Sequence, residues 1–384
     1  MAGHSLADSP CGRLVPITDG QMAFVPDPLP RRLELASSTV SRLDEASHAV
    51  GMLAGVGETI PNPHLLIRPF VRREAVLSSR IEGTQASLSD LFLHEAGDMR
   101  RPKGDVVEVV NYVRALEQGI QLLERLPISV RLMNEIHAVL LQGVRGQEKR
   151  PGELRNEPVW IGSEGTSLGE ARYVPPPASM VRDLMQDLEQ FCNDDLELPP
   201  LVQCALLHYQ FEAIHPYLDG NGRIGRLLIT LFLCWKGVLP KPLLYLSAYF
   251  ERDRTAYYDQ LLNLSATGNW EAWLSYFLRG VAQQAQDAIR RIRSVRELQE
   301  KYRQLLQERR ESANALRMVD ELFASPFMTA GRAARMLGIT PEGARGILER
   351  LAQAGVVERV QGTWPHLYVA RELLQAIEEP EASG

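Results

Sequence analysis

Apolar residues recur every three or four positions along most of this 384-residue chain, which is the spacing of one helix face. Two short stretches, 155–162 and 171–176, lose that period and predict a β-hairpin whose loop is rich in Gly and Ser. Pro61, Pro63 and Pro69 are expected to interrupt the chain before the second helix. The predicted helices span residues 33–53, 70–80, 105–126, 129–141, 180–191, 201–214, 227–235, 248–264, 270–282 and 283–317. The fold class is therefore predicted to be all-α with one hairpin.

The last sixty residues show a different pattern, of two short helices followed by a small hairpin. The predicted elements are helices at 329–337 and 340–355 and strands at 356–360 and 367–370. Helix, tight turn, helix and hairpin is the outline of a winged helix-turn-helix domain. Its second helix carries Arg345 and Arg350 but also Glu342 and Glu349. A DNA contact and a protein or dimer contact therefore both stay open.

The composition is that of an ordinary soluble protein, with 45% hydrophobic and 23% charged residues. A formal net charge of −6 gives no general attraction to nucleic acid or acidic membranes. No apolar run approaches the length of about 18 residues that indicates a membrane span, and the N-terminus shows no secretory pattern. The four cysteines are scattered without a C-x-x-C pair. These features predict a cytoplasmic protein without a membrane partner.

The strongest chemical signal lies in segment 215–226, which reads HPYLDGNGRIGR. Pro216 keeps His215 out of helical geometry, so the preceding helix should end there. The next helix, 227–235, is apolar on nearly every face and should be buried. The glycines of the loop can let backbone N–H groups converge on an anion at the start of that helix.

The charged side chains of this segment complete the chemical pattern. Arg223 and Arg226, three residues apart, add fixed positive charge beside the loop. Asp219 would repel a phosphate unless a divalent cation lay between them. An anion nest, two arginines, a carboxylate and the imidazole of His215 together predict a nucleotide–Mg²⁺ site with a base.

Segment 215–226 resembles the pattern His-x-Phe-x-Asp/Glu-Gly-Asn-Gly-Arg-x-x-Arg of the Fic family, with Tyr217 at the usual Phe. The resemblance covers about residues 33–278. It implies an all-helical Fic core with a β-hairpin flap. It also implies a protein adenylyltransferase, which transfers AMP from ATP to Ser, Thr or Tyr hydroxyls of target proteins and of itself.

The resemblance also implies roles for individual residues. His215 would be the general base, Asp219 would hold Mg²⁺, and Arg223 and Arg226 would bind the phosphate chain. The phosphate-binding segment would comprise Gly220, Asn221, Gly222, Arg223, Ile224, Gly225 and Arg226, with Asn221 shaping it. Tyr258, and less directly its neighbour Tyr257, would border the adenine. The asparagine that follows in the family falls at about Ser265 here.

A second motif lies in residues 78–83, SSRIEG. Ser78 and Glu82 are four apart and share a helical face, and Gly83 is a natural helix stop. Taken alone, this pattern is typical of a surface glutamate at a helix end. It also resembles Ser/Thr-x-x-x-Glu-Gly/Asn, the inhibitory-helix signature of Fic proteins. That resemblance implies that Glu82 pairs with Arg226 and occupies the space needed by a productive γ-phosphate.

With these motifs the chain divides into five predicted parts. They are an N-terminal tail that wraps the surface or stays mobile (1–32), N-terminal helices including the inhibitory helix (33–100), the Fic catalytic core (101–282), a helical connector (283–324) and the winged helix-turn-helix-like domain (325–384). The flap at 155–176 would align a protein substrate as an added strand. The connector could pair with a second copy, giving a homodimer.

Alternatives of other classes stay open from the sequence. The chain could be a DNA-binding regulator whose Fic core only senses nucleotide. It could also transfer a different phosphate-containing moiety, such as UMP or phosphocholine, because the motif contacts phosphates rather than a head group. Removal of AMP is a further alternative, with Glu82 orienting a water molecule.

Overall fold

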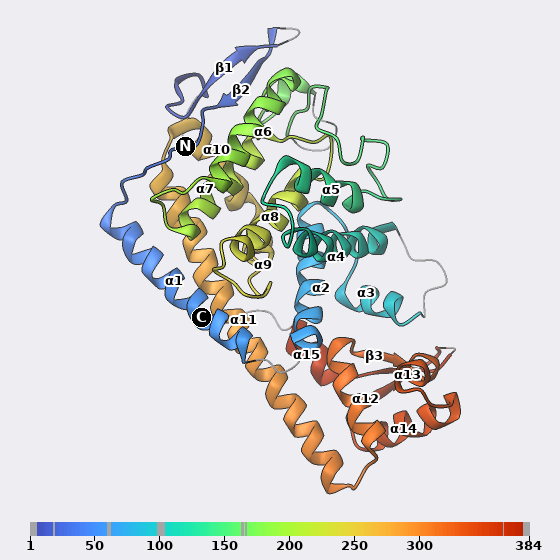
Figure 1. Cartoon of the computed structure of the whole chain (residues 1–384). Helices are drawn as coiled ribbons and strands as arrows, with labels where there is room; N and C mark the ends of the chain where they lie inside the picture. The colour runs from blue at the N-terminus through green and yellow to red at the C-terminus, as the bar shows by residue number, and fades with distance from the viewer. Residues whose placement is uncertain are drawn as a thin grey trace.

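The computed structural model of the chain describes residues 6–17, 20–59, 63–97, 104–162, 165, 167–363 and 365–378. It is mostly helical, as predicted, and carries two small antiparallel sheets (Figure 1). The helices of the first two thirds are η1 Leu6–Asp8, α1 Ser37–Glu58, α2 Pro63–Ile81, α3 Leu88–Glu95, α4 Gly104–Leu122, α5 Val130–Leu140, η3 Leu168–Glu170, α6 Ala178–Asn193, α7 Pro200–Ile214, α8 Asn221–Trp235, α9 Ser247–Arg252 and α10 Arg254–Thr267. The remaining helices are α11 Trp270–Glu308, α12 Ala313–Ala324, α13 Ala330–Leu337, α14 Pro341–Gln353 and α15 Arg371–Glu378. The strands are β1 Gly12–Pro16, β2 Met22–Pro26, β3 Phe327–Thr329, β4 Glu358–Val360 and β5 Leu367–Val369.

The centre of the molecule is the antiparallel pair α7 and α8. Nearly every residue of both helices is buried, which follows from their apolar character on all faces. Helices α4, α5, α6 and α11 pack around the pair. The loop 215–220 joins the two central helices, so its position is fixed by the packing of the core.

Helix α2 connects this core to the C-terminal part of the chain. It packs against α4 and α9 and also against α12 and α15 (Figure 1). The expectation that Pro61, Pro63 and Pro69 interrupt the chain before this helix was wrong for the last two, because α2 begins at Pro63 and contains Pro69. Pro61 lies outside the described residues. A proline in the first turn loses no helical hydrogen bond, and Pro69 forfeits one that the packing of α2 outweighs.

The N-terminal segment, predicted as a tail, contains a hairpin that packs against the rest of the chain. Strands β1 and β2 pair in antiparallel register from Gly12↔Pro26 to Pro16↔Met22. Phe24 is fully buried against Tyr173, with ring centroids 6.0 Å apart, and its N–H donates to Val174 O at 2.9 Å. Five-residue strands among Gly and Pro give too short an alternation to stand out in the sequence.

The predicted flap hairpin at 155–162 and 171–176 is present only in reduced form. Ile161 and Tyr173 form one antiparallel bridge, and neither stretch forms a regular strand in the described residues. Pro158 and the Pro175–Pro176 pair supply no N–H group, so a ladder cannot extend through them.

Several predicted helix boundaries were also wrong, among them the start of α8, which lies at Asn221 and not at residue 227. The helix predicted at 248–264 is divided into α9 and α10 at Asp253, whose Oδ1 accepts the Ala256 N–H at 2.9 Å and caps α10. The helices predicted at 270–282 and 283–317 are one helix, α11, followed by α12 after Arg310 in left-handed conformation. The change from apolar to charged composition near residue 283 was read as a boundary, but no helix-breaking residue lies there.

The C-terminal region contains the predicted short helix, second helix and hairpin as α13, α14, β4 and β5. A third strand, β3, pairs with β5 to give the order β3-β5-β4, and α15 closes the region. The winged helix-turn-helix assignment and the five domain boundaries stay predictions. Residues 1–5 of the predicted tail and 379–384 of the predicted C-terminal domain lie outside the described residues. In the described ranges, no helix combines the length and apolar character needed to cross a membrane.

We expect the hairpin β1–β2 to contribute directly to stability. Phe24→Ala should lower the free energy of unfolding by about 3–5 kcal/mol, because a fully buried aromatic side chain leaves a cavity. Met22→Ala on the same strand, where the side chain is 41% exposed, should change it by less than about 0.5 kcal/mol. Urea denaturation of both variants measures the difference, and equal values would show that the hairpin is not part of the core.

Candidate active site

The loop between α7 and α8 has two residues in left-handed conformation. His215 ends α7 with φ 52° and ψ 63°, because Pro216 excludes the helical region for it. Gly220 precedes α8 with φ 78°, a conformation that glycine adopts without strain. Directly after Gly220, the Asn221 side chain bonds back to the loop. Its Oδ1 accepts the Tyr217 N–H and its Nδ2 donates to Tyr217 O, both at 2.8 Å. The amide of Asn221 therefore holds the loop closed.

Tyr217 occupies the position where the Fic pattern has Phe. Its ring is buried and stacks on His137, with centroids 3.8 Å apart. Its hydroxyl donates to Asn134 Oδ1 at 2.8 Å, so the added polar group is satisfied. His137 Nε2 also lies 2.9 Å from Asp219 O, and this contact connects α5 to the loop. The substitution of Tyr for Phe is thus accommodated without loss of the loop geometry.

His215 is a partly buried imidazole at the edge of a cavity. Burial lowers its pKa to about 4, and the positive charge of Arg155 acts in the same direction. The carboxylate of Glu82 and the backbone carbonyl of Glu212 oppose this shift in pKa. The ring is therefore neutral at pH 7 and can accept a proton.

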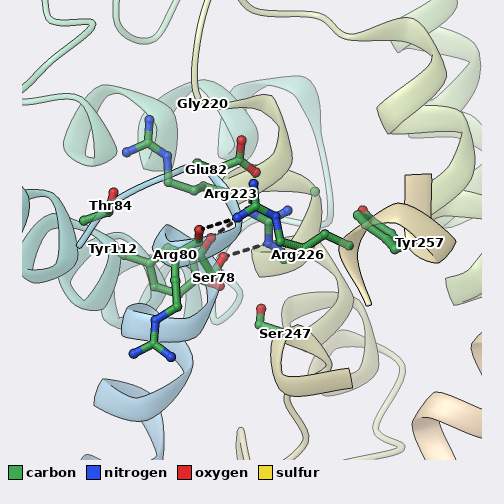
Figure 2. A network of polar contacts seen from close by, with 12 residues as sticks. Ser78, Arg80, Glu82, Thr84, Tyr112, Gly220, Arg223, Arg226, Ser247 and Tyr257 are labelled. Atoms are coloured by element: carbon green, nitrogen blue, oxygen red, sulfur yellow. Dashed lines mark hydrogen bonds and ion pairs between the residues drawn. The ribbon is translucent and has the colours of Figure 1, made fainter. Parts of the chain in front are cut away.

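Arg226 joins α8 to the end of α2 (Figure 2). Its Nη2 donates to Glu82 Oε1 at 2.6 Å and to Ser78 O at 3.0 Å, and its Nε donates to Ser78 Oγ at 2.8 Å. Burial raises the pKa of Glu82, but the nearby cations, chiefly Arg226 with its charge and hydrogen bond, outweigh this effect. The pKa is therefore lower than that of an ordinary glutamate, and the carboxylate is ionised at pH 7. The contact between Glu82 and Arg226 that the family resemblance implies is present, and Gly83 follows with φ 93°.

Arg223 is held by two carboxylates. Its Nη2 donates to Asp219 Oδ1 at 3.3 Å, and its Nη1 lies 3.5 Å from Glu108 Oε2. Glu108 is 4% exposed and also accepts from Thr84 Oγ1 at 2.9 Å. This network connects α4 and the segment after α2 to the first turn of α8. Glu108 was missed because a single glutamate in an amphipathic helix gives no signal in the sequence.

A cavity of about 610 Å³ lies beside His215. Residues lining it come from α2, the flap, α7, α8 and α10, and include Glu82, Trp160, Ile161, Arg172, Tyr173, Tyr209, Glu212, His215, Gly222, Arg226, Arg254, Tyr258 and Ser265. Asp219, Gly220, Asn221, Arg223, Ile224 and Gly225 lie outside this lining.

The two tyrosines of α10 differ in position. Tyr258 lines the cavity, whereas Tyr257 is 1% exposed and its hydroxyl lies 2.8 Å from His208 Nε2. Of the two tyrosines, Tyr258 is therefore the one that a ligand in the cavity could contact. Ser265 also borders the cavity, and its hydroxyl lies 3.0 Å from that of Tyr209.

Glu212 is a cavity residue that the sequence reading did not identify. Burial raises its pKa to about 8, and Arg226 opposes that shift only in part. A carboxyl group that is largely protonated at pH 7 can both donate and accept a hydrogen bond. Its position on α7, three residues before His215, is the signal that could have identified it.

The comparisons with known proteins agree with this geometry. Residues 40–121 match the Fic/DOC family N-terminal domain, and residues 127–233 match the Fic/DOC family. The chain therefore contains a Fic N-terminal domain and a Fic domain. A crystal structure of a Fic family protein from Desulfovibrio desulfuricans G20 superposes with a TM-score of 0.57, at 20% identity, over 88% of this chain and 97% of that one. The Fic fold therefore accounts for most of the chain.

Two curated relatives are similar in sequence to parts of this chain. Protein adenylyltransferase Fic of Drosophila willistoni is 34% identical over 121 residues, which are 31% of this chain and 22% of that protein. Protein adenylyltransferase fic-1 of Caenorhabditis elegans is 27% identical over 197 residues, 51% of this chain and 34% of that protein. The chain thus spans between about a fifth and a third of the length of these relatives.

We expect Asn221 to stabilise the loop measurably. Asn221→Ala removes both side-chain bonds to Tyr217 and leaves a buried N–H and C=O without partners, which should lower the free energy of unfolding by about 1–3 kcal/mol. Asn156→Ala, at an exposed position, should leave it nearly unchanged. The measurement is urea denaturation followed by tryptophan fluorescence. Indistinguishable midpoints for the two variants would contradict the role of this amide.

Proposed function

We propose that this Fic-family chain transfers AMP from ATP to Ser, Thr or Tyr hydroxyl groups of target proteins and of itself, releasing pyrophosphate. The carrying observation is a neutral imidazole, His215, that shares one cavity with the Arg226 guanidinium and the first turn of α8. The curated names of the relatives, protein adenylyltransferase, support nucleotidyl transfer as the reaction class.

In the proposed reaction, the oxygen of the target hydroxyl forms a bond to the α-phosphorus of ATP while His215 accepts the proton of that hydroxyl. The bond from that phosphorus to the bridging oxygen breaks, and pyrophosphate leaves. The N-terminal end of α8, from Gly220 onward, carries partial positive charge that stabilises the charge developing on the phosphate oxygens. Arg226 would bind the phosphate chain directly, and Arg223, which does not line the cavity, would add its positive charge from outside the lining.

Asp219 fits the predicted role of a Mg²⁺ ligand. Its side chain is 33% exposed, and its Oδ1 accepts from the Gly220 N–H and from Arg223. A Cβ on Gly146 would come within 2.6 Å of Oδ2, so Gly146 keeps room beside that oxygen. Mg²⁺ typically takes one or two carboxylates with phosphate oxygens and water, and when bound it would neutralise phosphate charge.

The remaining contacts are assigned within the same proposal. Tyr258, with Ser265 nearby, would border the adenine at the α10 side of the cavity. The flap around 155–176 would align the target segment by backbone pairing near the Ile161–Tyr173 bridge. We also propose that the protein is located in the cytoplasm and forms a homodimer.

The C-terminal region offers mixed support for DNA as a partner. On α14, Arg345 is exposed together with Glu342 and Glu349, and Arg350 pairs with Glu311 at 3.0 Å. Alternating charge attracts phosphate weakly, so a protein contact fits this face better. Intact mass after incubation with each nucleotide donor separates AMP transfer from transfer of UMP or phosphocholine, and a gel shift tests DNA.

We also propose that Glu82 inhibits the transfer. In the described structure it holds Arg226 by a bond of 2.6 Å, and Arg226 is the cation that a γ-phosphate would need. A carboxylate and a phosphate oxygen compete for the same donors. Displacement of Glu82 would therefore allow ATP to bind with its α-phosphate in line for attack.

The role of His215 predicts loss of chemistry without loss of binding. His215→Ala should lower labelling from α-³²P-ATP by about two to four orders of magnitude, the usual contribution of a general base. ATP binding measured by calorimetry should persist, because the phosphates contact Arg226 and α8. His48→Ala, an exposed histidine on α1, is the matched control. Labelling by His215→Ala at the parental rate would remove the residue from the mechanism.

The inhibitory role predicts a gain of function. Glu82→Gly frees Arg226 from a charge-assisted pair worth about 1.5–3 kcal/mol, so self-labelling should rise about tenfold or more. It should vanish again in the double variant with His215→Ala. Glu58→Gly, which removes an exposed glutamate at the end of α1, should label like the parent. Equal labelling by Glu82→Gly and Glu58→Gly, at matched folding, would contradict the inhibitory role of Glu82.

A further inference from the structure

Arg155 is a buried cation whose bonds all go to backbone carbonyls. It is 3% exposed, and no carboxylate of the described residues pairs with it. Its Nε donates to His215 O at 2.8 Å, and its Nη2 donates to Ile214 O at 3.3 Å. Nη2 also donates to Pro176 O at 2.6 Å, and Nη1 donates to Glu157 O at 3.2 Å. A buried arginine without an acidic partner is uncommon and calls for an explanation.

One part of the explanation is the C-terminus of α7. The last carbonyls of a helix have no partner within it and form the negative end of its dipole. Arg155 satisfies those of Ile214 and His215, and the Tyr173 hydroxyl satisfies Ala213 O at 2.9 Å. Side chains from the flap region therefore cap α7 at the residue that adopts the left-handed conformation. This conformation is unfavourable for a residue other than glycine, so it needs such support.

The other part concerns the flap. Glu157 and Pro176 lie at the two ends of the flap segment, and both carbonyls accept from the same guanidinium. The backbone N–H of Arg155 adds a bond to Pro216 O at 2.9 Å. One side chain thus fixes both ends of the flap to the residue that carries the proposed base. A planar guanidinium with five N–H donors can make these bonds at once, and an ammonium group cannot.

We propose that Arg155 is a positioning residue for nucleotide transfer, which holds His215 and the flap in one fixed geometry. This inference rests on the proposed function, in which the flap presents the target hydroxyl to His215. Arg155 is absent from the cavity lining and so acts through the backbone rather than by touching the nucleotide. The same cation lowers the pKa of the His215 imidazole, which gives the role a second measurable consequence.

The kinetic test uses the full chain in the Glu82→Gly background. Arg155→Gln should lower kcat about tenfold to a hundredfold, the effect expected when reacting groups lose their alignment, with KM for ATP changed by less than about twofold. Arg155→Lys should keep the charge but lose most of the bonds, so its kcat should fall as well. Arg182→Gln, which removes an exposed arginine of α6, is the control in the same background and should match Glu82→Gly alone.

The second readout is the titration of His215 by NMR in the nucleotide-free protein, assigned by comparison with His215→Ala. In Arg155→Gln the pKa of the imidazole should rise, because a neighbouring positive charge is gone. In Arg155→Lys it should stay low while kcat falls. A merely structural role would lower the melting temperature but leave both kcat of the folded protein and this pKa unchanged, and that result overturns the proposal.

Two further outcomes are also decisive. Should Arg155→Gln fail to fold, Arg155→Lys decides alone, and a kcat equal to that of Glu82→Gly alone overturns the proposal. Should the parent and Glu82→Gly both fail to transfer AMP, the proposed function fails. The NMR titration then still tests Arg155, because an unchanged pKa of His215 in Arg155→Gln contradicts the effect of its charge on the imidazole.

Discussion

The buried guanidinium of Arg226 determines how the helices around the site are arranged. Its side chain is 1% exposed, and a charge at such a position is stable only when a counter-charge and hydrogen-bond acceptors surround it. Ser78, in the last turn of α2, and Glu82, which directly follows α2, supply these groups. Helix α2 must therefore lie against α8. Because α2 also packs against α4, α9 and α12, the C-terminal region is positioned by the helix that meets Arg226.

The parts of the site that were predictable from the sequence are those set by neighbouring residues. Pro216 after His215 predicts the end of α7, and the apolar run after Arg226 predicts a buried α8, and both are confirmed. The contact of Glu82 with Arg226 joins residues 144 positions apart, which no local pattern encodes. It was expected only from the resemblance to Fic proteins. The chemical roles of these residues stay predictions, because geometry alone does not test them.

The features that were missed depend on partners far along the chain. Arg155 and Glu108 each look like one solvent-exposed charge in the sequence, and only the fold brings α7 or Arg223 against them. The hairpin β1–β2 is similar, since its stability comes from Phe24 packing on Tyr173. Helix lengths were also misjudged where composition changed without a breaker, as in α11. Local patterns predict that an element exists, whereas tertiary contacts determine where it ends and what it contacts.

Two glycines, one at the end of the loop and one in the first turn of α8, show that phosphate binding is not the only constraint on the shape of the site. Gly220 is required by its positive φ, whereas Gly222 is helical and is required by space. A Cβ on Gly222 would collide with Glu82 Oε1 and lie 2.9 Å from Arg226 Nη1. The surface that a nucleotide phosphate would approach is therefore already fitted to a carboxylate. On the proposed function, the nucleotide must replace the same contact that holds α2 against α8. The stability of this helix pair and the access of the γ-phosphate are then two effects of one interaction, and a change that weakens one should favour the other.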